Sequence, residues 1–278
     1  MVFLNGEFIK KNKAFISVMD RGFLFGDGVY EVIPVYQGKI FRLNDHLKRL
    51  EHSLNAINIA NPYSAQEYLG ICKQLLSHTN KNEKNQSIYL QITRGVGTQR
   101  KHATGLLKPT VYIETNPLTP QSKQTLKKGF KAITQSDIRW THCDIKATSL
   151  LANVMYSQSA KEHQVEEIIL HRDNLVTEGA TSNVFMIKDS TLFTHPASVY
   201  ILSGITRDLV IESAKQCQLT IQESAFTLEQ LTQADEVWIS SSTREVMPIT
   251  HVNNQAINQG NVGKYWSCVY DYYQTLKK

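Results

Sequence analysis

A polar stretch with two prolines, NPLTPQSKQ from Asn116 to Gln124, divides the chain into two parts with different residue patterns. Such composition is typical of a linker, because prolines and polar residues interrupt regular elements. A chain of 278 residues is also long for a single small core. We therefore expect a small N-terminal domain over 1–118, a linker over 119–124 and a large C-terminal domain over 125–278.

The N-terminal part is predicted to contain strands followed by helices. VFLNGEFI, with Asn5-Gly6 at its turn, and GVYEVIPVYQGKIF are both typical of hairpins. A helix is predicted for DHLKRLEHSLNAI, and another begins at a capping box formed by Ser64 and Glu67. Two further strands, QSIYLQITRG and TVYIET, precede the linker.

The C-terminal part has a different order of elements. KGFKAITQS predicts a strand, and EEIILHRDNLVTEGATSNVFMIKDSTLFTH predicts strands joined by turns. A helix from about Thr206, a strand around DEVWISSS and a C-terminal amphipathic helix rich in Tyr and Trp follow. Strands and helices in this arrangement predict the α+β class.

Lys146 lies in the segment THCDIKATSLLANV, immediately before an apolar run. Apolar residues recur there at the spacing of a core-facing helix: Ala147, Leu150, Leu151, Val154 and Met155. The expected helix would begin directly after Lys146. Most lysines at helix ends are solvated and have no role, so this segment alone does not identify a site.

Four further segments could carry chemistry, although each also has an ordinary structural explanation. Gly204-Ile205-Thr206 could present helix N–H groups to a phosphate, or be a simple N-cap. Glu178 in TEGATSNVF could pair with a protonated ring nitrogen, or be a solvated turn carboxylate. The hydroxyls of SSSTRE could bind a phosphate, or belong to an ordinary loop.

The fourth segment, GTQRKHATG, carries Arg100 and His102 between glycines. An arginine binds a carboxylate with two parallel hydrogen bonds, and a histidine two residues later can add a donor. A solvated basic loop is the alternative explanation. Taken singly, none of the four segments decides the function.

Composition excludes several classes of protein. The net charge of +5 is spread along the chain, without the basic clusters of a nucleic-acid surface. The four cysteines are far apart and form no CxxC pair, so neither a zinc site nor a disulfide framework is expected. There is no signal-peptide pattern and no apolar stretch of membrane-spanning length. We expect a cytoplasmic protein without a bound metal, a nucleic-acid partner or a membrane anchor.

Taken together, these segments resemble the class IV aminotransferases, which are fold-type IV pyridoxal 5'-phosphate (PLP) enzymes. The resemblance rests on one long spaced pattern: Glu178, Ala180, Asn183, Val184, Phe185, Leu192, Thr194, Leu202, Gly204, Ile205 and Arg207. DRGFLFGDGVYEV and HLKRL are similar to the family's N-terminal half. The family fold implies a small N-terminal α/β domain, a larger C-terminal domain and a cofactor at their interface.

The resemblance also implies roles for individual residues toward the cofactor. Lys146 would be the catalytic lysine, joined to PLP as a Schiff base and moving the substrate proton. Glu178 would hold the pyridinium N–H. The residues implied for the phosphate are Arg49, Ile205, Thr206 and Ser242.

Within the family, the resemblance is strongest to the branch that acts on D-amino acids. FGDGVYEV, DIRW, CDIK, VTEG and GITRD carry it, together with the Arg-x-His loop. Tyr30, Arg100 and His102 would receive the substrate α-carboxylate, and in this family that loop comes from the neighbouring subunit of a homodimer. The implied reaction transfers the amino group of a D-amino acid such as D-alanine to 2-oxoglutarate or pyruvate.

Three other functions of the same fold stay open at this point. They are a branched-chain L-amino acid aminotransferase, an (R)-amine transaminase and an aminodeoxychorismate lyase, and a non-catalytic PLP-binding module is a fourth possibility. Four residues also depart from the expected pattern: Pro34, Ala180, Ser242 and Arg244. Arg244 stands where a small polar residue is expected, and we expect it and Pro34 to affect the substrate pocket.

Overall fold

The computed structural model describes residues 1–79 and 83–277 of the chain. The chain separates into two compact units. The N-terminal unit comprises Met1–Thr119 and Ile145–Leu150, and the C-terminal unit comprises Pro120–Asp144 and Leu151–Lys278. This division differs from the expected one, because the short segment around Lys146 belongs to the N-terminal unit and the C-terminal unit begins at Pro120.

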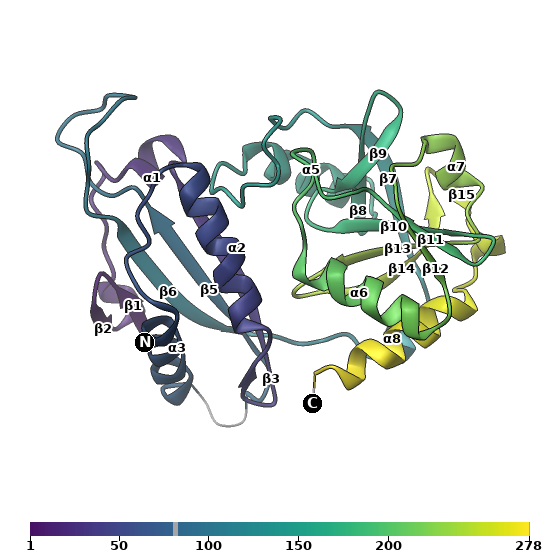
Figure 1. Cartoon of the computed structure of the whole chain (residues 1–278), viewed down its shortest axis with the longest axis horizontal. Helices are drawn as coiled ribbons and strands as arrows, with labels where there is room; N and C mark the ends of the chain where they lie inside the picture. Colours follow the sequence, from purple (N-terminus) through teal and green to yellow (C-terminus); the bar gives the residue numbers. More distant parts are fainter. Residues whose placement is uncertain (80–82, 278) are drawn as a thin grey trace. The chain divides into compact units, whose positions relative to one another are not determined.

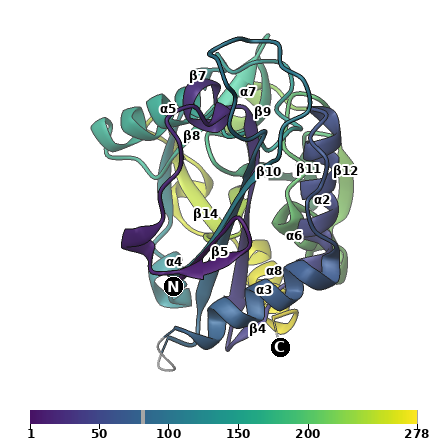
Figure 2. The same cartoon turned by 90° about the vertical axis from the view of Figure 1, so that its left-hand side faces the viewer.

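The described part of the N-terminal unit contains one antiparallel sheet with the strand order β2-β1-β6-β5-β3-β4. Its strands are β1 (Val2–Leu4), β2 (Glu7–Ile9), β3 (Gly28–Tyr36), β4 (Lys39–Ile40), β5 (Gln86–Thr93) and β6 (Thr110–Pro117). Its helices are a 3-10 turn (Lys11–Lys13), α1 (Arg21–Phe25), α2 (Leu43–Ala56) and α3 (Ala65–Ser77). Both views show α2 and α3 on the same side of this sheet (Figures 1 and 2).

The core of this unit lies between the sheet and those two helices. Leu50 and Leu54 of α2 and Tyr68 of α3 pack with apolar side chains of β3 and β5, among them Ile33 and Ile88. Every second residue of β3 and β5 faces this layer, as expected for a sheet covered on one side. The apolar face of α2 therefore fixes its position over β3, the strand that carries Tyr30.

Local predictions for this unit are confirmed. The first hairpin turns at Asn5 and Gly6, which have φ angles of 52° and 103°. Asparagine and glycine adopt such angles more readily than other residues. Ser64 and Glu67 form the predicted capping box at the start of α3. Both features depend on residues close together in sequence.

The described part of the C-terminal unit is built on a mixed sheet with the order β12-β11-β10-β13-β14-β7-β8-β9, to which β15 adds beside β14. Its strands are β7 (Phe130–Ser136), β8 (Glu167–Arg172), β9 (Leu175–Gly179), β10 (Asn183–Lys188), β11 (Thr191–Thr194), β12 (Thr220–Glu223), β13 (Glu236–Ser241), β14 (Glu245–Val252) and β15 (Gln255–Ala256). Its helices are α4 (Lys123–Leu126), α5 (Leu151–Glu162), α6 (Ile205–Gln216), α7 (Leu228–Thr232), a 3-10 turn (Asn258–Gly260) and α8 (Lys264–Thr275).

The helix expected directly after Lys146 is shorter than predicted and buries a different face. It begins at Leu151, so residues 146–150 are a loop. Its buried residues are Tyr156 and Ala160, whereas Val154 and Met155 are 60% and 53% exposed. The prediction of a core-facing stripe was therefore wrong. Apolar spacing identifies an apolar face, but not whether that face meets the chain's own core.

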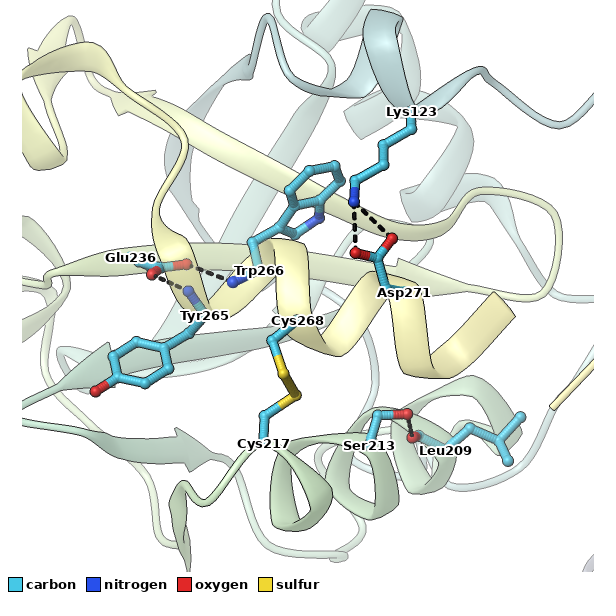
Figure 3. Close-up of a disulfide and its surroundings, with 9 residues drawn as sticks. All are labelled: Lys123, Leu209, Ser213, Cys217, Glu236, Tyr265, Trp266, Cys268 and Asp271. Carbon is cyan, nitrogen blue, oxygen red and sulfur yellow. Dashed lines mark hydrogen bonds and ion pairs between the residues drawn. A yellow bond between two sulfur atoms is a disulfide. The ribbon is translucent and has the colours of Figure 1, made fainter. Parts of the chain in front are cut away.

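A disulfide joins Cys217 at the end of α6 to Cys268 in α8. Figure 3 shows this bond between two helices that lie side by side. We expected no disulfide framework, and this single bond was not anticipated, because fifty-one residues separate the two cysteines and no local spacing indicates their pairing. Cys72 and Cys143 are buried free thiols.

The beginning of α8 is also held from a distant strand. The Glu236 carboxylate of β13 accepts hydrogen bonds from the backbone N–H groups of Tyr265 and Trp266, both at 2.9 Å (Figure 3). Such groups lack partners within the helix, and a carboxylate there also faces the positive end of the helix dipole. Among the residues described, no helix is both long and apolar enough to cross a membrane.

Candidate active site

Lys146 is held in the N-terminal unit by its backbone. Its carbonyl accepts a hydrogen bond from Tyr30 N (3.0 Å), and its own N–H donates to Ser53 Oγ (3.1 Å). Ser53 is fully buried on α2, and Tyr30 lies on β3. The Lys146 Nζ lies 4.3 Å from the centre of the Tyr30 ring. Lys146 is therefore mounted between a strand and a helix, with its amine beside Tyr30.

Arg49 lies on α2 in a buried charged cluster with Glu31 and His46. Arg49 donates through Nε to Glu31 Oε1 (2.7 Å) and through Nη2 to Oε2 (2.8 Å). His46 Nδ1 lies 2.8 Å from the same Oε2. Burial alone would raise the pKa of Glu31, but Arg49 and His46 reverse this and hold it below its usual range. Glu31 therefore fixes the orientation of the Arg49 guanidinium.

Arg100 and His102 lie in a long loop between β5 and β6. The buried Arg21 donates to the carbonyls of Lys101 (2.6 Å) and His102 (2.7 Å). The Phe25 ring contacts both predicted side chains, with the Arg100 guanidinium 5.0 Å and the His102 ring 5.4 Å from its centre. The loop backbone is thus anchored by α1, while both side chains remain exposed.

Glu178 lies at the end of β9 in the C-terminal unit and is almost completely buried. Oε1 accepts a hydrogen bond from Arg139 Nη1 (2.6 Å). Oε2 accepts from Leu202 N (3.0 Å) and Asn183 Nδ2 (3.2 Å). Burial raises the pKa of Glu178 to about 7, although Arg139 and the Leu202 N–H oppose it. The Glu178 carboxyl group therefore titrates close to neutral pH, and its three hydrogen bonds hold it in one orientation.

Arg139 is in turn held by Asp137. Its Nε and Nη2 donate to the two oxygens of Asp137, each at 2.9 Å. Arg172 donates to Asp137 Oδ2 as well, at 3.1 Å. Asp137 thus supports the arginine that contacts Glu178.

The start of α6 lies beside the same group of residues. Its N-cap is Gly204, and no side chain caps it. A Cβ on Gly204 would lie 2.1 Å from Asn183 Oδ1, so only glycine fits there without a shift. Asn183 pairs across the sheet with Ser240, whose hydroxyl is buried without a hydrogen-bond partner. Unpaired N–H groups at a helix start and a free buried hydroxyl suit an anion.

Ser242 is the first residue after β13, in the turn that leads to β14, and is partly exposed. The predicted residues therefore fall into two sets. The N-terminal unit holds Lys146, Tyr30, Arg49, Arg100 and His102, and the C-terminal unit holds Glu178, Ile205, Thr206 and Ser242. In the second set, Asn183 and Leu202 link Glu178 to the start of α6.

Several supporting residues were missed by the sequence analysis: Arg21, Glu31, Asp137 and Arg139. Each has a charged, largely buried side chain that is held by ion pairs or hydrogen bonds to groups brought near by folding. One signal was available, because His46 and Arg49 are three residues apart and so share a helix face. A buried carboxylate opposite that face could have been sought among the strands.

A family model for class IV aminotransferases matches residues 28–252 of the chain. The chain belongs to the class IV aminotransferases. The matched region includes most of both units, and the family resemblance seen in the sequence is confirmed. The α+β fold class, the aminotransferase activity and the PLP dependence predicted from it are confirmed with it.

Two curated relatives of this aminotransferase cover nearly its whole length. It is 39% identical to the D-alanine aminotransferase of Listeria innocua, over 98% of this chain and 94% of the relative. It is 41% identical to that of Staphylococcus epidermidis, over 94% of this chain and 92% of the relative. The predicted resemblance to the D-amino acid branch is confirmed by these relatives.

Solved structures show the same fold. The branched-chain amino acid aminotransferase of Escherichia coli has a TM-score of 0.87 at 26% identity, over 97% of this chain and 92% of its own. The branched-chain aminotransferase of the archaeon Thermoproteus uzoniensis, solved with norvaline, has a TM-score of 0.87 at 25% identity, over 99% of this chain and 94% of its own. Both likenesses extend over the two units of the chain.

Proposed function

We propose that this class IV aminotransferase transfers amino groups between D-amino acids and 2-oxo acids. D-alanine and 2-oxoglutarate are the expected pair, and D-glutamate and pyruvate the products. The observation that carries the proposal is the near full-length identity of about two residues in five to enzymes named D-alanine aminotransferase. The Arg100-x-His102 loop, which distinguished this branch in the sequence, supports the same choice.

The residues of the C-terminal unit suit PLP as the cofactor. The uncapped start of α6, with Ile205 and Thr206, offers N–H donors to a phosphate. Ser240 supplies a buried hydroxyl without a partner, and Ser242 adds another in the adjacent turn. The backbone at Gly204 has no room for a Cβ, and Glu178 adds a buried carboxylate to the groups that suit PLP.

Each residue then has a defined task. Lys146 would hold the cofactor through its amine and, once released, would act as the base that moves the proton at the substrate Cα. Glu178 holds the proton on the ring nitrogen, and Arg49 adds a positive charge for the phosphate. When bound, PLP supplies an electron sink for the negative charge left on Cα. The fixed mount of Lys146 matters because proton transfer requires a well-positioned base.

Tyr30, Arg100 and His102 bind the substrate α-carboxylate in this proposal. When an arginine holds the carboxylate in one place, the single Cα hydrogen faces Lys146 in only one of the two enantiomers. The enzyme therefore selects that enantiomer. Arg100→Ala should therefore raise KM for D-alanine by about tenfold or more, the loss expected for one charged hydrogen bond. Unchanged D-alanine kinetics in this variant would show that the clamp is misassigned.

A homodimer is part of the proposal, since exposed apolar side chains occur in both units. In the N-terminal unit they include Phe15, Val18, Phe23 and Leu106. In the C-terminal unit they include Ile138, Trp140, Leu151, Val154 and Met155. Neighbouring exposed apolar side chains, such as Leu151, Val154 and Met155 on α5, are typical of protein interfaces. A second copy would cover them and would supply the Arg-x-His loop across the interface, as in the family.

A cytoplasmic location remains a prediction. One of its arguments was that the spacing of the cysteines indicates no disulfide framework, and the Cys217–Cys268 bond speaks against that argument. In a reducing cytoplasm these two cysteines would be thiols for most of the time.

The test is a visible spectrum of the purified protein with PLP, recorded after separate additions of D-alanine, L-alanine and L-leucine. No amino acceptor is present at first. Loss of the band of bound cofactor with D-alanine alone, followed by its return on addition of 2-oxoglutarate, is the expected result. Loss with L-leucine or L-alanine would favour the branched-chain reaction. No response to any amino acid, with pyruvate released from aminodeoxychorismate, would favour the lyase.

A further inference from the structure

Arg244 departs from the family pattern, and none of the tasks proposed for the cofactor site involves it. It closes the turn 242–244, which joins β13 to β14 and contains Ser242. Its backbone N–H donates to Ser241 Oγ (3.3 Å). The next residue, Glu245, has a φ of 60°, and a left-handed residue after such a turn is typical of three-residue hairpin loops. Arg244 is therefore rigidly joined to the turn that carries Ser242.

The guanidinium of Arg244 does not extend into solvent but turns toward a second loop. Nη2 donates to Glu167 Oε2 (3.1 Å) and to Thr181 Oγ1. Nη1 donates to the Glu166 carbonyl (3.3 Å). The side chain is 25% exposed, and that of Glu167 is 3% exposed. Arg244 thus provides the positive partner of a buried carboxylate.

Glu167 in turn supports the loop that follows Glu178. Its Oε2 also accepts from Ser182 Oγ (2.7 Å). Within this loop, Gly179 N donates to the Ser182 carbonyl (2.6 Å), and a Cβ on Gly179 would lie 3.0 Å from Glu167 Cδ. The loop therefore packs directly on Glu167. A shift of Glu167 would move the residue that follows Glu178.

We propose that Arg244 is a positioning residue that ties the turn carrying Ser242 to the loop following Glu178. It thereby holds Glu167 and, through it, the loop that follows Glu178, so that the carboxylate proposed for the ring of the cofactor keeps its position. The guanidinium donates to Glu167 and Thr181 through Nη2 and to the Glu166 carbonyl through Nη1, a spread over two nitrogens that suits an arginine better than a small residue. The inference rests on the proposed function, because it assumes a cofactor at these residues.

The experiment uses the full chain as apoprotein, in the wild type and in Arg244→Met, Arg244→Lys and Lys188→Met. Lys188 lies at the end of β10 that is away from Asn183, where it pairs with Asp235. It serves as the matched control. Dissociation constants are measured for PLP and for pyridoxal, which lacks the phosphate, by the visible absorbance of the bound form. The Tm of each apoprotein is recorded in parallel.

In Arg244→Met we expect both dissociation constants to rise by about tenfold, as is common for outer partners of the ligands of a bound group. Arg244→Lys should recover part of this loss, and Lys188→Met should change neither constant by more than about twofold. The rise for pyridoxal is decisive. An arginine that only attracted the phosphate would weaken PLP binding and leave pyridoxal unaffected.

Removal of Arg244 alone leaves the Glu167 carboxylate buried without its cation, which can prevent folding. Should Arg244→Met not fold, the double variant Arg244→Met/Glu167→Gln removes both charges and takes its place. Wild-type affinity for PLP in a folded variant that lacks Arg244, or a loss confined to PLP, would overturn this inference and leave the proposed function standing. A wild type that binds neither compound would overturn both.

Discussion

Glu178 is subject to two opposing influences on its charge. Burial favours the neutral acid, whereas Arg139 and two further donors favour the carboxylate. The net effect raises its pKa from 4.5 to about 7. Glu178 therefore changes its protonation state near neutral pH in the protein without cofactor.

The raised pKa predicts a specific pH dependence for the apoprotein. A folded-state pKa above the unfolded value means that the stabilisation from Glu178 is complete below about pH 4.5 and lost as the pH rises through about 7. The urea midpoint of the wild type should therefore fall relative to that of Glu178→Gln between about pH 5 and pH 8. The difference in unfolding free energy is at most about 3 kcal/mol. Parallel pH curves for the two proteins would mean that Arg139 keeps Glu178 ionised throughout.

Glu31 supports a different prediction, which concerns the phosphate alone. Because Glu31 orients the Arg49 guanidinium through two hydrogen bonds, Glu31→Gln should leave Arg49 poorly positioned. PLP should then bind about tenfold more weakly, while the affinity for pyridoxal should stay the same. Titration of the apoprotein with both compounds checks this. Equal losses for both would place Arg49 away from the phosphate.

At the scale of elements, the Cys217–Cys268 bond fixes the end of α6, whose start is proposed to bind phosphate. In the chain-entropy description, closing a loop of this length stabilises the folded state by about 4 kcal/mol. Reduction, or Cys217→Ser/Cys268→Ser, should lower the Tm by about 10 °C. Cys268 is exposed and therefore accessible to a reductant.

The double serine variant is also the control, because a reductant should not change its Tm. Titration of thiols under denaturing conditions gives the oxidation state of the purified protein. Four reactive thiols before any reduction would show that the bond does not form during expression.

The elements that were predicted correctly depend on neighbouring residues. The turn at Asn5 and Gly6 and the capping box at Ser64 and Glu67 are set by backbone preferences of a few adjacent positions. The helix after Lys146 was placed incorrectly, since residues 146–150 instead form backbone hydrogen bonds with β3. Such a choice is made by tertiary contacts, which no local pattern contains.

The same distinction applies to the candidate site. The residues implied to touch the cofactor were found through their types and spacing in a family pattern. Arg139, Asp137 and Glu31 were not, because each acts through a partner brought near by folding. A buried ion pair between distant segments has no periodicity in the sequence, so its members look like any surface charge.

At the scale of the whole molecule, the exposed stripe of α5 bears on the proposed homodimer. Val154 is 60% exposed, beside Leu151 and Met155. Val154→Glu should convert the dimer to a monomer, because it places a charge within an apolar interface. Light scattering after size-exclusion chromatography measures the mass, and Leu175→Glu, at an exposed position on β9, is the control. A dimer in both variants would exclude this stripe from the interface.

The path of the chain has a consequence for how such a protein can be divided. Chain segments pass between the two units three times, after Thr119, after Asp144 and after Leu150. A gene split at the proline-containing linker would therefore yield a first product without the peptide that bridges β3 at Val29. The second product would carry Lys146 without its strand or Ser53. The units of this chain are thus not interchangeable modules, and a chimaera that exchanges one of them between relatives must preserve all three junctions.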